Sequence, residues 1–270
     1  MEDRMQLKKL LSYIEKQQYI EANIMAGTEE DYRKTWKTWS EKVWTGYAEL
    51  KNADFKEGEA LFLVAIYFAG KPDETVMPLL RRLQMVMKNR NDIISGGMLA
   101  ASYYGEEELS MRIPTLEDGI RNLYIDKKCI EALTGSIMIA DGGPAEVAKA
   151  IQWYMFLTRN GLDVNACRMA RLIGLLAVIS SSPNIVGQKL LTGINTNVES
   201  NKKDEKNTQD IFCEEACTYI QGLCQKEQER IRKLDRTSYK ILTGEKNVTS
   251  ADYPDSEVEE DISLNGSNLL

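Results

Sequence analysis

The sequence predicts an all-α protein, in which a multi-helix bundle body is followed by a C-terminal helical element and a disordered acidic tail. Three observations support this fold class. Apolar residues recur at spacings of three and four along most of the chain, which is the period of a helix with one buried face. Capping residues, glycines and prolines divide this pattern into segments of helix length. A chain of 270 residues with 43% hydrophobic residues can also bury a substantial core.

Glycine and capping residues set the predicted boundaries in the first 105 residues. Gly27 ends the first helix, and Thr28 opens the second as the first residue of a sequence that resembles a capping box. Gly70 ends the third helix, Asp73 caps the fourth and Asp92 caps the fifth. The predicted helices cover residues 2–25, 28–50, 57–69, 74–90 and 93–104.

Two of these helices carry the strongest apolar patterns. The helix over 28–50 has an aromatic stripe that we interpret as a core face, and an exposed platform for stacking nucleic acid bases is the alternative. Residues 60–69 are apolar on every side, which favours a fully buried central helix over a buried strand. The pair Gly96–Gly97 permits close approach by a neighbouring helix. The stripe consists of Tyr32, Trp36, Trp39, Val43, Trp44 and Tyr47.

Turn residues organise the second half of the body. Residues 106–114 carry three consecutive acids and end at a proline, so we expect a loop there and a helix beginning at Thr115. Pro144 suits the first turn of a helix, because a proline at that position removes no helical hydrogen bond. Further helices are predicted over 127–140, 144–160 and 163–179, with a shorter one that ends at Leu191.

The chain is predicted to consist of four parts. A helical body covers 1–192 and forms one bundle or two helical subdomains with a break near 105–115. A polar linker covers 193–208, and a long amphipathic helical region covers 209–243. Residues 244–270 form the tail, which we expect to be disordered because it is acidic and has few large apolar residues. The tail holds most of the net charge of −7, so the body is close to neutral.

The absence of histidine excludes several classes of function. No Ser-His-Asp or Cys-His catalysis and no mixed Cys/His zinc site can form without an imidazole. The glycine pairs lack the spacing of phosphate-binding loops. The stripe of Cys213, Cys217 and Cys224 lacks a fourth zinc ligand, so we interpret these residues as small buried hydrophobes. We therefore predict no catalytic residue, no metal and no cofactor, and hence no enzyme.

The cysteine count and the N-terminal residues bear on the compartment. The five cysteines are an odd number, and Met1–Met5 lack the layout of a signal peptide, so we expect a cytosolic or nuclear protein without a disulfide framework. No apolar stretch reaches the length that a membrane-spanning helix requires.

Basic side chains gather at three places in the predicted body. Such groups bind phosphates of RNA or anionic lipid through salt-sensitive attraction, and an ordinary solvated helix face is the alternative. The first choice for a lipid- or RNA-binding patch is the group in the helix over 74–90, where Arg81 and Lys88 are seven residues apart and share a face. This group consists of Arg81, Arg82, Lys88 and Arg90, and the secondary candidates are Lys127, Lys128, Arg168 and Arg171.

Residues 142–180 resemble a known family. A turn at Gly143–Pro144 leads to Lys149-Ala150-Ile151, Tyr154 and Arg159, and a second helix contains 166–170 (ACRMA) and 172–175 (LIGL). This pattern is similar to the middle of the matrix proteins of orthomyxoviruses, and the length and helical layout resemble those of the thogotoviruses. The family's basic helix after the turn is not matched, because Lys149 and Arg159 are the only bases of that segment.

The resemblance implies a viral structural protein that self-assembles beneath the envelope and bridges membrane lipid to the ribonucleoprotein. Its expected partners are further copies of itself, anionic membrane lipid and viral RNA or ribonucleoprotein. Its expected locations are the virion, the host cytoplasm and nucleus, and the inner face of the plasma membrane. Two alternatives stay open: a nucleocapsid protein of a negative-strand RNA virus, and a cellular helical adaptor.

Overall fold

The computed structural model describes residues 5–12, 29–71, 76–179, 182–200 and 208–226, with side chains for all of these except 29–32, 193–200 and 221–226. These residues contain helices and no strand, so the predicted all-α class is confirmed. Residues 5–12 are helical. The labelled helices are α2 (Glu29–Asn52), α3 (Glu59–Ala69), α4 (Val76–Met87), α5 (Ile93–Ala100), α6 (Glu106–Ile120), α7 (Lys127–Ile139), α8 (Pro144–Arg159), α9 (Cys167–Ile179), α10 (Pro183–Ser200) and α11 (Thr208–Lys226). The predicted cap at Asp73, residues 227–243 and the acidic tail over 244–270 lie outside the described residues.

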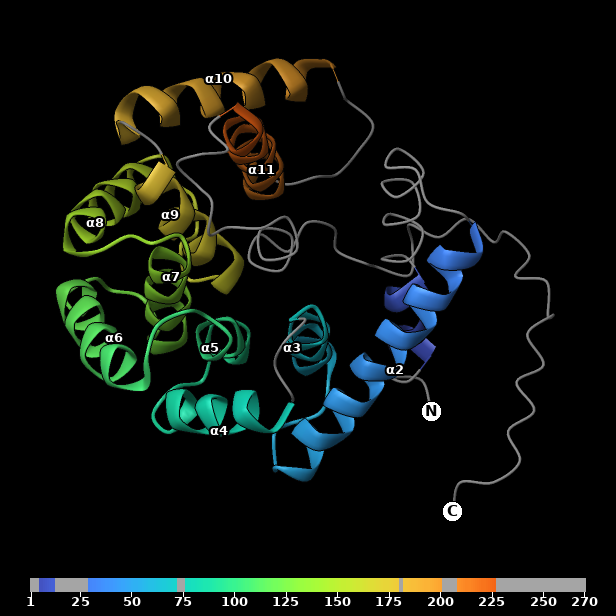
Figure 1. The fold of residues 1–270 in the computed structure, drawn as a ribbon. Helices are drawn as coiled ribbons and strands as arrows, with labels where there is room; N and C mark the ends of the chain where they lie inside the picture. The colour runs from blue at the N-terminus through green and yellow to red at the C-terminus, as the bar shows by residue number, and fades with distance from the viewer. Residues whose placement is uncertain (1–4, 13–28, 72–75, 180–181, 201–207, 227–270) are drawn as a thin grey trace.

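Helix α7 lies at the centre of one part of the molecule, and α5, α6, α8 and α9 surround it (Figure 1). Its burial reflects this central position, because every residue from Glu131 to Ile139 is buried. The other part is built on α3, which packs between α2 and α5. The buried apolar side chains form one continuous core from Leu7 to Ile220.

The apolar run over 60–69 forms a buried helix, as predicted. Helix α2 packs on it through Trp44 and Tyr47, whose rings lie 4.9 and 5.4 Å from the ring of Phe62. Trp36 and Trp39 pack partly buried against the same core, with their ring centroids 4.8 Å apart. The aromatic stripe is therefore a core face over the residues whose side chains are described.

Glycines allow the closest helix contacts. A Cβ atom on Gly97 would lie 2.6 Å from the side chain of Val64, so α3 and α5 could not approach as they do with a larger residue there. A Cβ atom on Gly174 would lie 2.5 Å from the carbonyl oxygen of Leu133. The contact between α7 and α9 therefore depends on a glycine as well, and substitution at either site would separate two core helices.

The predicted loop over 106–114 is wrong, because α6 begins at Glu106 and continues through Pro114. Three acids stand in its first turn, where carboxylates interact favourably with the helix dipole. Its buried face consists of Leu109, Ile113, Leu116 and Ile120. Burial of this stripe offsets the hydrogen bond that Pro114 cannot donate.

The predicted helix end at Leu191 is also wrong, because α10 continues to Ser200. Residues 193–200, expected in the linker, are therefore helical. The segment contains no proline after Pro183, and a single glycine at 193 does not stop a helix that is already formed. Helix α11 begins at Thr208, close to the predicted start, and packs on α9 and α10 through buried Phe212, Ala216 and Ile220.

Candidate functional site

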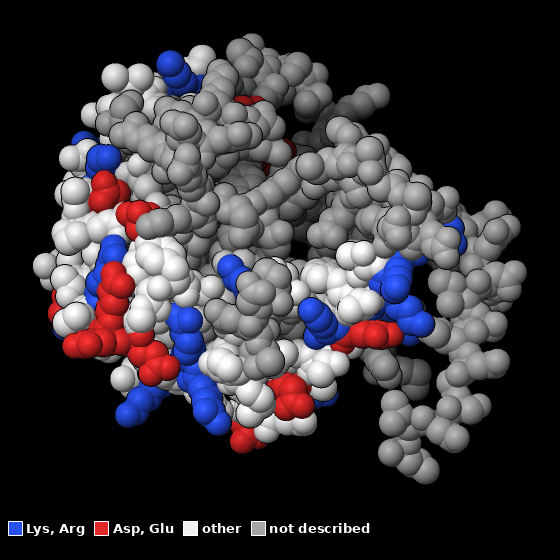
Figure 2. All heavy atoms as spheres, viewed as in Figure 1, with Lys and Arg blue, Asp and Glu red and all other residues white. Residues whose placement is uncertain are grey.

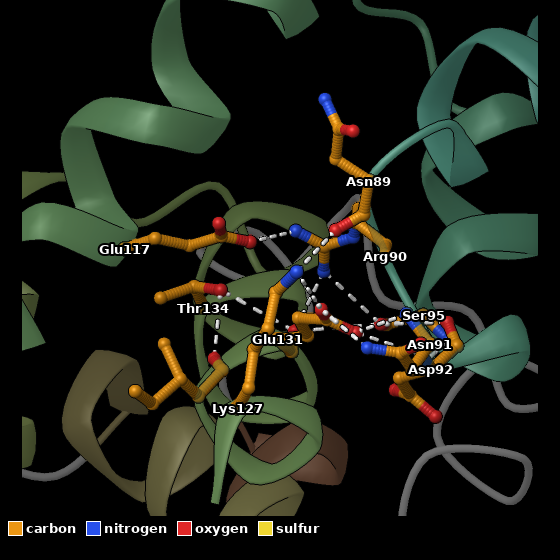
Figure 3. Close-up of polar contacts among 10 residues, drawn as sticks. Asn89, Arg90, Asn91, Asp92, Ser95, Glu117, Lys127, Glu131 and Thr134 are labelled. Carbon is orange, nitrogen blue, oxygen red and sulfur yellow. Dashed lines mark hydrogen bonds and ion pairs between the residues drawn. The ribbon is translucent and has the colours of Figure 1, made fainter. Parts of the chain in front are cut away.

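Charged side chains that are far apart in the sequence meet near the N-terminal end of α7, and Figure 3 shows Arg90 and Lys127 there beside Glu117 and Glu131. Arg90 lies in the connection between α4 and α5, Lys127 is the first residue of α7, and Arg171 belongs to α9. Asp92, Glu117 and Glu131 lie among them. We call these six side chains the Arg90 network. The fold thus brings together charged groups that are distant from one another in the sequence.

Arg90 points into the protein and is only 7% exposed. Its Nη1 donates to the carboxylate of Glu117 on α6. Its Nη2 donates to the carbonyl oxygen of Glu131 at 2.8 Å and to Ser95 Oγ at 3.4 Å. One guanidinium therefore ties the α4–α5 connection to both α6 and α7.

Glu131 is completely buried in α7. Its Oε2 accepts hydrogen bonds from the backbone N–H groups of Asn91 at 2.5 Å and Asp92 at 2.8 Å. Lys127 Nζ lies 3.8 Å from its Oε1, one helical turn away. The carboxylate thus satisfies two N–H groups of the chain entering α5, of which the buried one, on Asp92, would otherwise lack an acceptor.

Asp92 has two roles at the start of α5. It caps the helix as predicted, because its Oδ2 accepts from the backbone N–H of Ser95 at 3.3 Å. Its Oδ1 accepts from Arg171 Nη2 of α9 at 2.5 Å, and both side chains are buried. This ion pair joins α5 to α9 across the α7 core.

The Arg90 network contains three cationic and three anionic side chains, so its formal charges cancel. Buried charges require such pairing, because an isolated ion loses far more hydration energy than the protein can return. The pairing is incomplete, since the buried Nε atoms of Arg90 and Arg171 have no hydrogen-bond partner among the described residues. Burial raises the pKa of Glu117 above the ordinary glutamate value, although Arg90 opposes this shift.

The network places a small group of bases on the surface, which we call the basic rim: Lys88, Lys127 and Lys128. Lys127 is 63% exposed at its side chain, and its Nζ donates to the carbonyl oxygen of Asn89 at 2.7 Å. This bond brings the first turn of α7 beside the residue that follows Lys88. Lys88 and Lys128 are exposed.

The predicted patch is therefore corrected. Arg90 and Arg171 are buried and paired, so neither forms part of a surface that meets lipid or RNA. Arg82 is half-buried and donates to the carbonyl oxygens of Ser102 and Tyr104 at 2.9 and 2.5 Å. Arg168 is half-buried on α9, and Arg81 is exposed on α4. Of the predicted residues, Arg81, Lys88, Lys127 and Lys128 are exposed, and the bond from Lys127 to Asn89 brings Lys127 beside the segment that carries Lys88.

Sequence reasoning did not single out Glu117 and Glu131, the carboxylates that hold the buried cations. A signal existed for Glu131, because a lone acid within the apolar run of α7 requires a partner when that helix is buried. Glu117 carried no such signal, because it lies among polar residues in a segment expected to begin a helix at Thr115.

A second polar group lies at the opposite, C-terminal end of α7. Asp141 adopts a positive φ of 63° and accepts from the hydroxyl groups of Tyr103 and Tyr104. The Tyr104 hydroxyl also lies 3.0 Å from the carbonyl oxygen of Met138, to which it can donate its hydrogen. Arg112 stacks over the Tyr104 ring and donates to the carbonyl oxygen of Gly142 at 2.9 Å. We call Tyr103, Tyr104, Arg112 and Asp141 the Asp141 group.

The visible face carries no extended field of one charge: acidic and basic side chains are interspersed over its described residues (Figure 2). Among the described residues, no group of three or more Asp, Glu or Cys side chains is placed to hold a metal ion. None of the described helices is long and apolar enough to cross a membrane. Comparisons with protein-family models, with curated proteins and with solved structures found no match.

Proposed function

We propose that this protein is a viral structural protein of matrix type, which assembles into a layer at the inner face of the plasma membrane and bridges anionic lipid to the ribonucleoprotein. The proposal rests on the resemblance of residues 142–180, which correspond to the turn before α8, α8 itself and α9. The observation that carries the contact with lipid is the basic rim, where the bond from Lys127 to Asn89 brings the first turn of α7 beside the segment that carries Lys88.

A rim of three lysines binds an anionic surface weakly, at about 1 kcal/mol for each base near the membrane. A layer of many copies sums these small contributions, because each bound subunit raises the effective concentration of its neighbours' sites. The Arg90 network supports this arrangement, since it fixes the α4–α5 connection, which begins at Lys88, against α7. The backbone that carries the rim therefore loses little conformational entropy when the rim binds.

The test is co-sedimentation with phosphatidylserine-containing vesicles at two salt concentrations. The rim variant combines Lys88→Glu with Lys128→Glu, and leaves Lys127 intact because it donates to Asn89. A matched control combines Lys34→Glu with Lys37→Glu, two exposed lysines of α2 that receive the same change in charge. We expect the rim variant to lose more than about tenfold in vesicle binding and the control to retain it.

Circular dichroism and thermal melting establish that both variants are folded. Equal vesicle binding by both variants and the unaltered protein would remove the rim from the proposal. Purified protein that protects RNA from nuclease, has a high ratio of absorbance at 260 to 280 nm and ignores vesicles would indicate a nucleocapsid protein instead. Binding to neither RNA nor vesicles would favour a cellular adaptor.

A further inference from the structure

We propose that Cys129 and Cys167 form an intramolecular disulfide when the protein meets an oxidant such as hydrogen peroxide. Their Sγ atoms lie 3.9 Å apart, across the contact between α7 and α9. A disulfide requires about 2.05 Å, so the two sulfurs must approach by about 2 Å. We expect rotation of the two cysteine side chains to bring the sulfurs together. This inference is independent of the proposed matrix function.

The two thiols differ in access. Cys129 is the third residue of α7 and is 2% exposed, whereas Cys167 is the first residue of α9 and is partly exposed. Burial raises the pKa of the Cys129 thiol to about 12, and the neighbouring Cys167 adds to the shift. Cys129 therefore stays protonated near neutral pH, and Cys167 is the sulfur that a small oxidant reaches.

The chemistry proceeds in two balanced steps. Hydrogen peroxide transfers one oxygen to the Cys167 sulfur, its O–O bond breaks, and the thiol becomes a sulfenic acid with release of one water. The Cys129 sulfur then attacks the Cys167 sulfur, so that an S–S bond forms and the S–O bond breaks. The hydroxyl group leaves with the proton of Cys129 as a second water. A thiol reductant converts the disulfide back to two thiols.

The disulfide would act on the Arg90 network. Arg171, which pairs with Asp92, lies one helical turn after Cys167 on α9. A bond between the first turns of α7 and α9 would fix these two helices at the end where the network joins them. It would also close a loop between residues 38 positions apart, which restricts the unfolded chain. We expect the melting temperature to rise by about 5–10 °C.

The test uses the full-length protein, reduced and then treated with a small molar excess of hydrogen peroxide. Intact mass should fall by two hydrogens per chain, and digestion without reductant should yield one linked peptide pair that contains Cys129 and Cys167. The melting temperature should rise, and reductant should reverse both changes. A Cys167→Ser variant should show neither change.

The control is Cys213→Ala, which removes a buried cysteine of α11 and should leave the linked peptide unchanged. Linkage through other cysteines, a disulfide between two chains, or oxidation of Cys167 without linkage would each overturn the inference. Because peptide mapping uses the unaltered protein, the result does not depend on the folding of any variant. Vesicle binding is a separate readout, so failure here leaves the matrix proposal standing.

Discussion

The two ends of α7 solve the same structural problem with different chemistry. Each end fastens a connection of the α4–α6 region to the central helix. At the N-terminal end, the Arg90 network uses charged side chains, of which Arg90, Asp92, Glu131 and Arg171 are buried. At the C-terminal end, the Asp141 group uses neutral phenols that donate to an exposed carboxylate and to a backbone carbonyl. The ionic end is therefore sensitive to loss of one partner, and the phenolic end is tolerant of it.

The difference follows from solvent access. Glu131 is fully buried, so a buried group that loses this carboxylate, such as the N–H of Asp92, has no replacement for it. Asp141 is exposed, and water can replace a lost hydroxyl group beside it. Burial raises the pKa of Tyr103 to about 12 and that of Tyr104 further, so both phenols keep their protons throughout the ordinary pH range. We expect mutational effects to be several-fold larger at the ionic end.

The largest expected effect comes from Glu131→Leu. The substitution fits the apolar surroundings of α7 but leaves the N–H groups of Asn91 and Asp92 without their acceptor, and it leaves the cations of the network in excess. We predict a loss of about 3–5 kcal/mol in the free energy of unfolding, measured by urea denaturation.

The matched control for that prediction is Glu131→Gln. Its amide oxygen can take the place of Oε2 and accept both N–H groups, while its NH₂ group stands at the Oε1 position. We expect it to lose less than half as much stability as Glu131→Leu. Equal losses from the two substitutions would show that charge, rather than the missing acceptor, controls this end of the helix.

An intermediate effect is expected from Tyr104→Phe at the phenolic end. The change removes one hydroxyl group that donates to Met138 and Asp141, and keeps the ring beneath Arg112. We predict a loss of about 1 kcal/mol. The paired variant Tyr103→Phe should cost less, because Tyr103 is 58% exposed. A loss from Tyr104→Phe as large as that from Glu131→Leu would erase the contrast between the two ends.

The sequence predicted the features that depend on local backbone chemistry and missed those that depend on tertiary packing. Boundaries at Gly70, Asp92 and Pro144 are correct, because each depends on local backbone chemistry that a single residue controls. The loop over 106–114 is wrong because the burial of Leu109 and Ile113 overrides Pro114, and burial is a tertiary property. Helix capping can be inferred from neighbours in sequence, whereas packing against α7 cannot.

The residues of the candidate site also differ in how well the sequence predicted their positions. Lys88 and Lys128 are exposed, whereas Arg90 and Arg171, which were candidates for the same kind of surface patch, are buried. Lys88 and Arg90 both follow the last turn of α4, so the helix-face argument that relates Arg81 to Lys88 applies to neither of them. The position of Arg90 depends on Glu117 and Glu131, which come 27 and 41 residues later. No spacing within one helix reports such a partner.

The smallest expected effect concerns pH and separates burial from pairing at Glu117. Burial raises the pKa of Glu117 in the folded protein. Between the unfolded and the folded pKa, the native state therefore still holds a proton that the unfolded chain has released. Stability should therefore fall as pH rises from the ordinary glutamate pKa of about 4.3 through the raised value. Glu117→Gln lacks this titration, so its stability relative to the unaltered protein should increase between pH 4 and pH 7, by less than the loss from Tyr104→Phe. Urea denaturation of both proteins across that range measures the difference.

If the relative stability of Glu117→Gln instead decreases with pH, the ion pair with Arg90 outweighs the burial of the carboxylate. The charges of the Arg90 network would then stabilise the fold, rather than only offset the cost of their own burial.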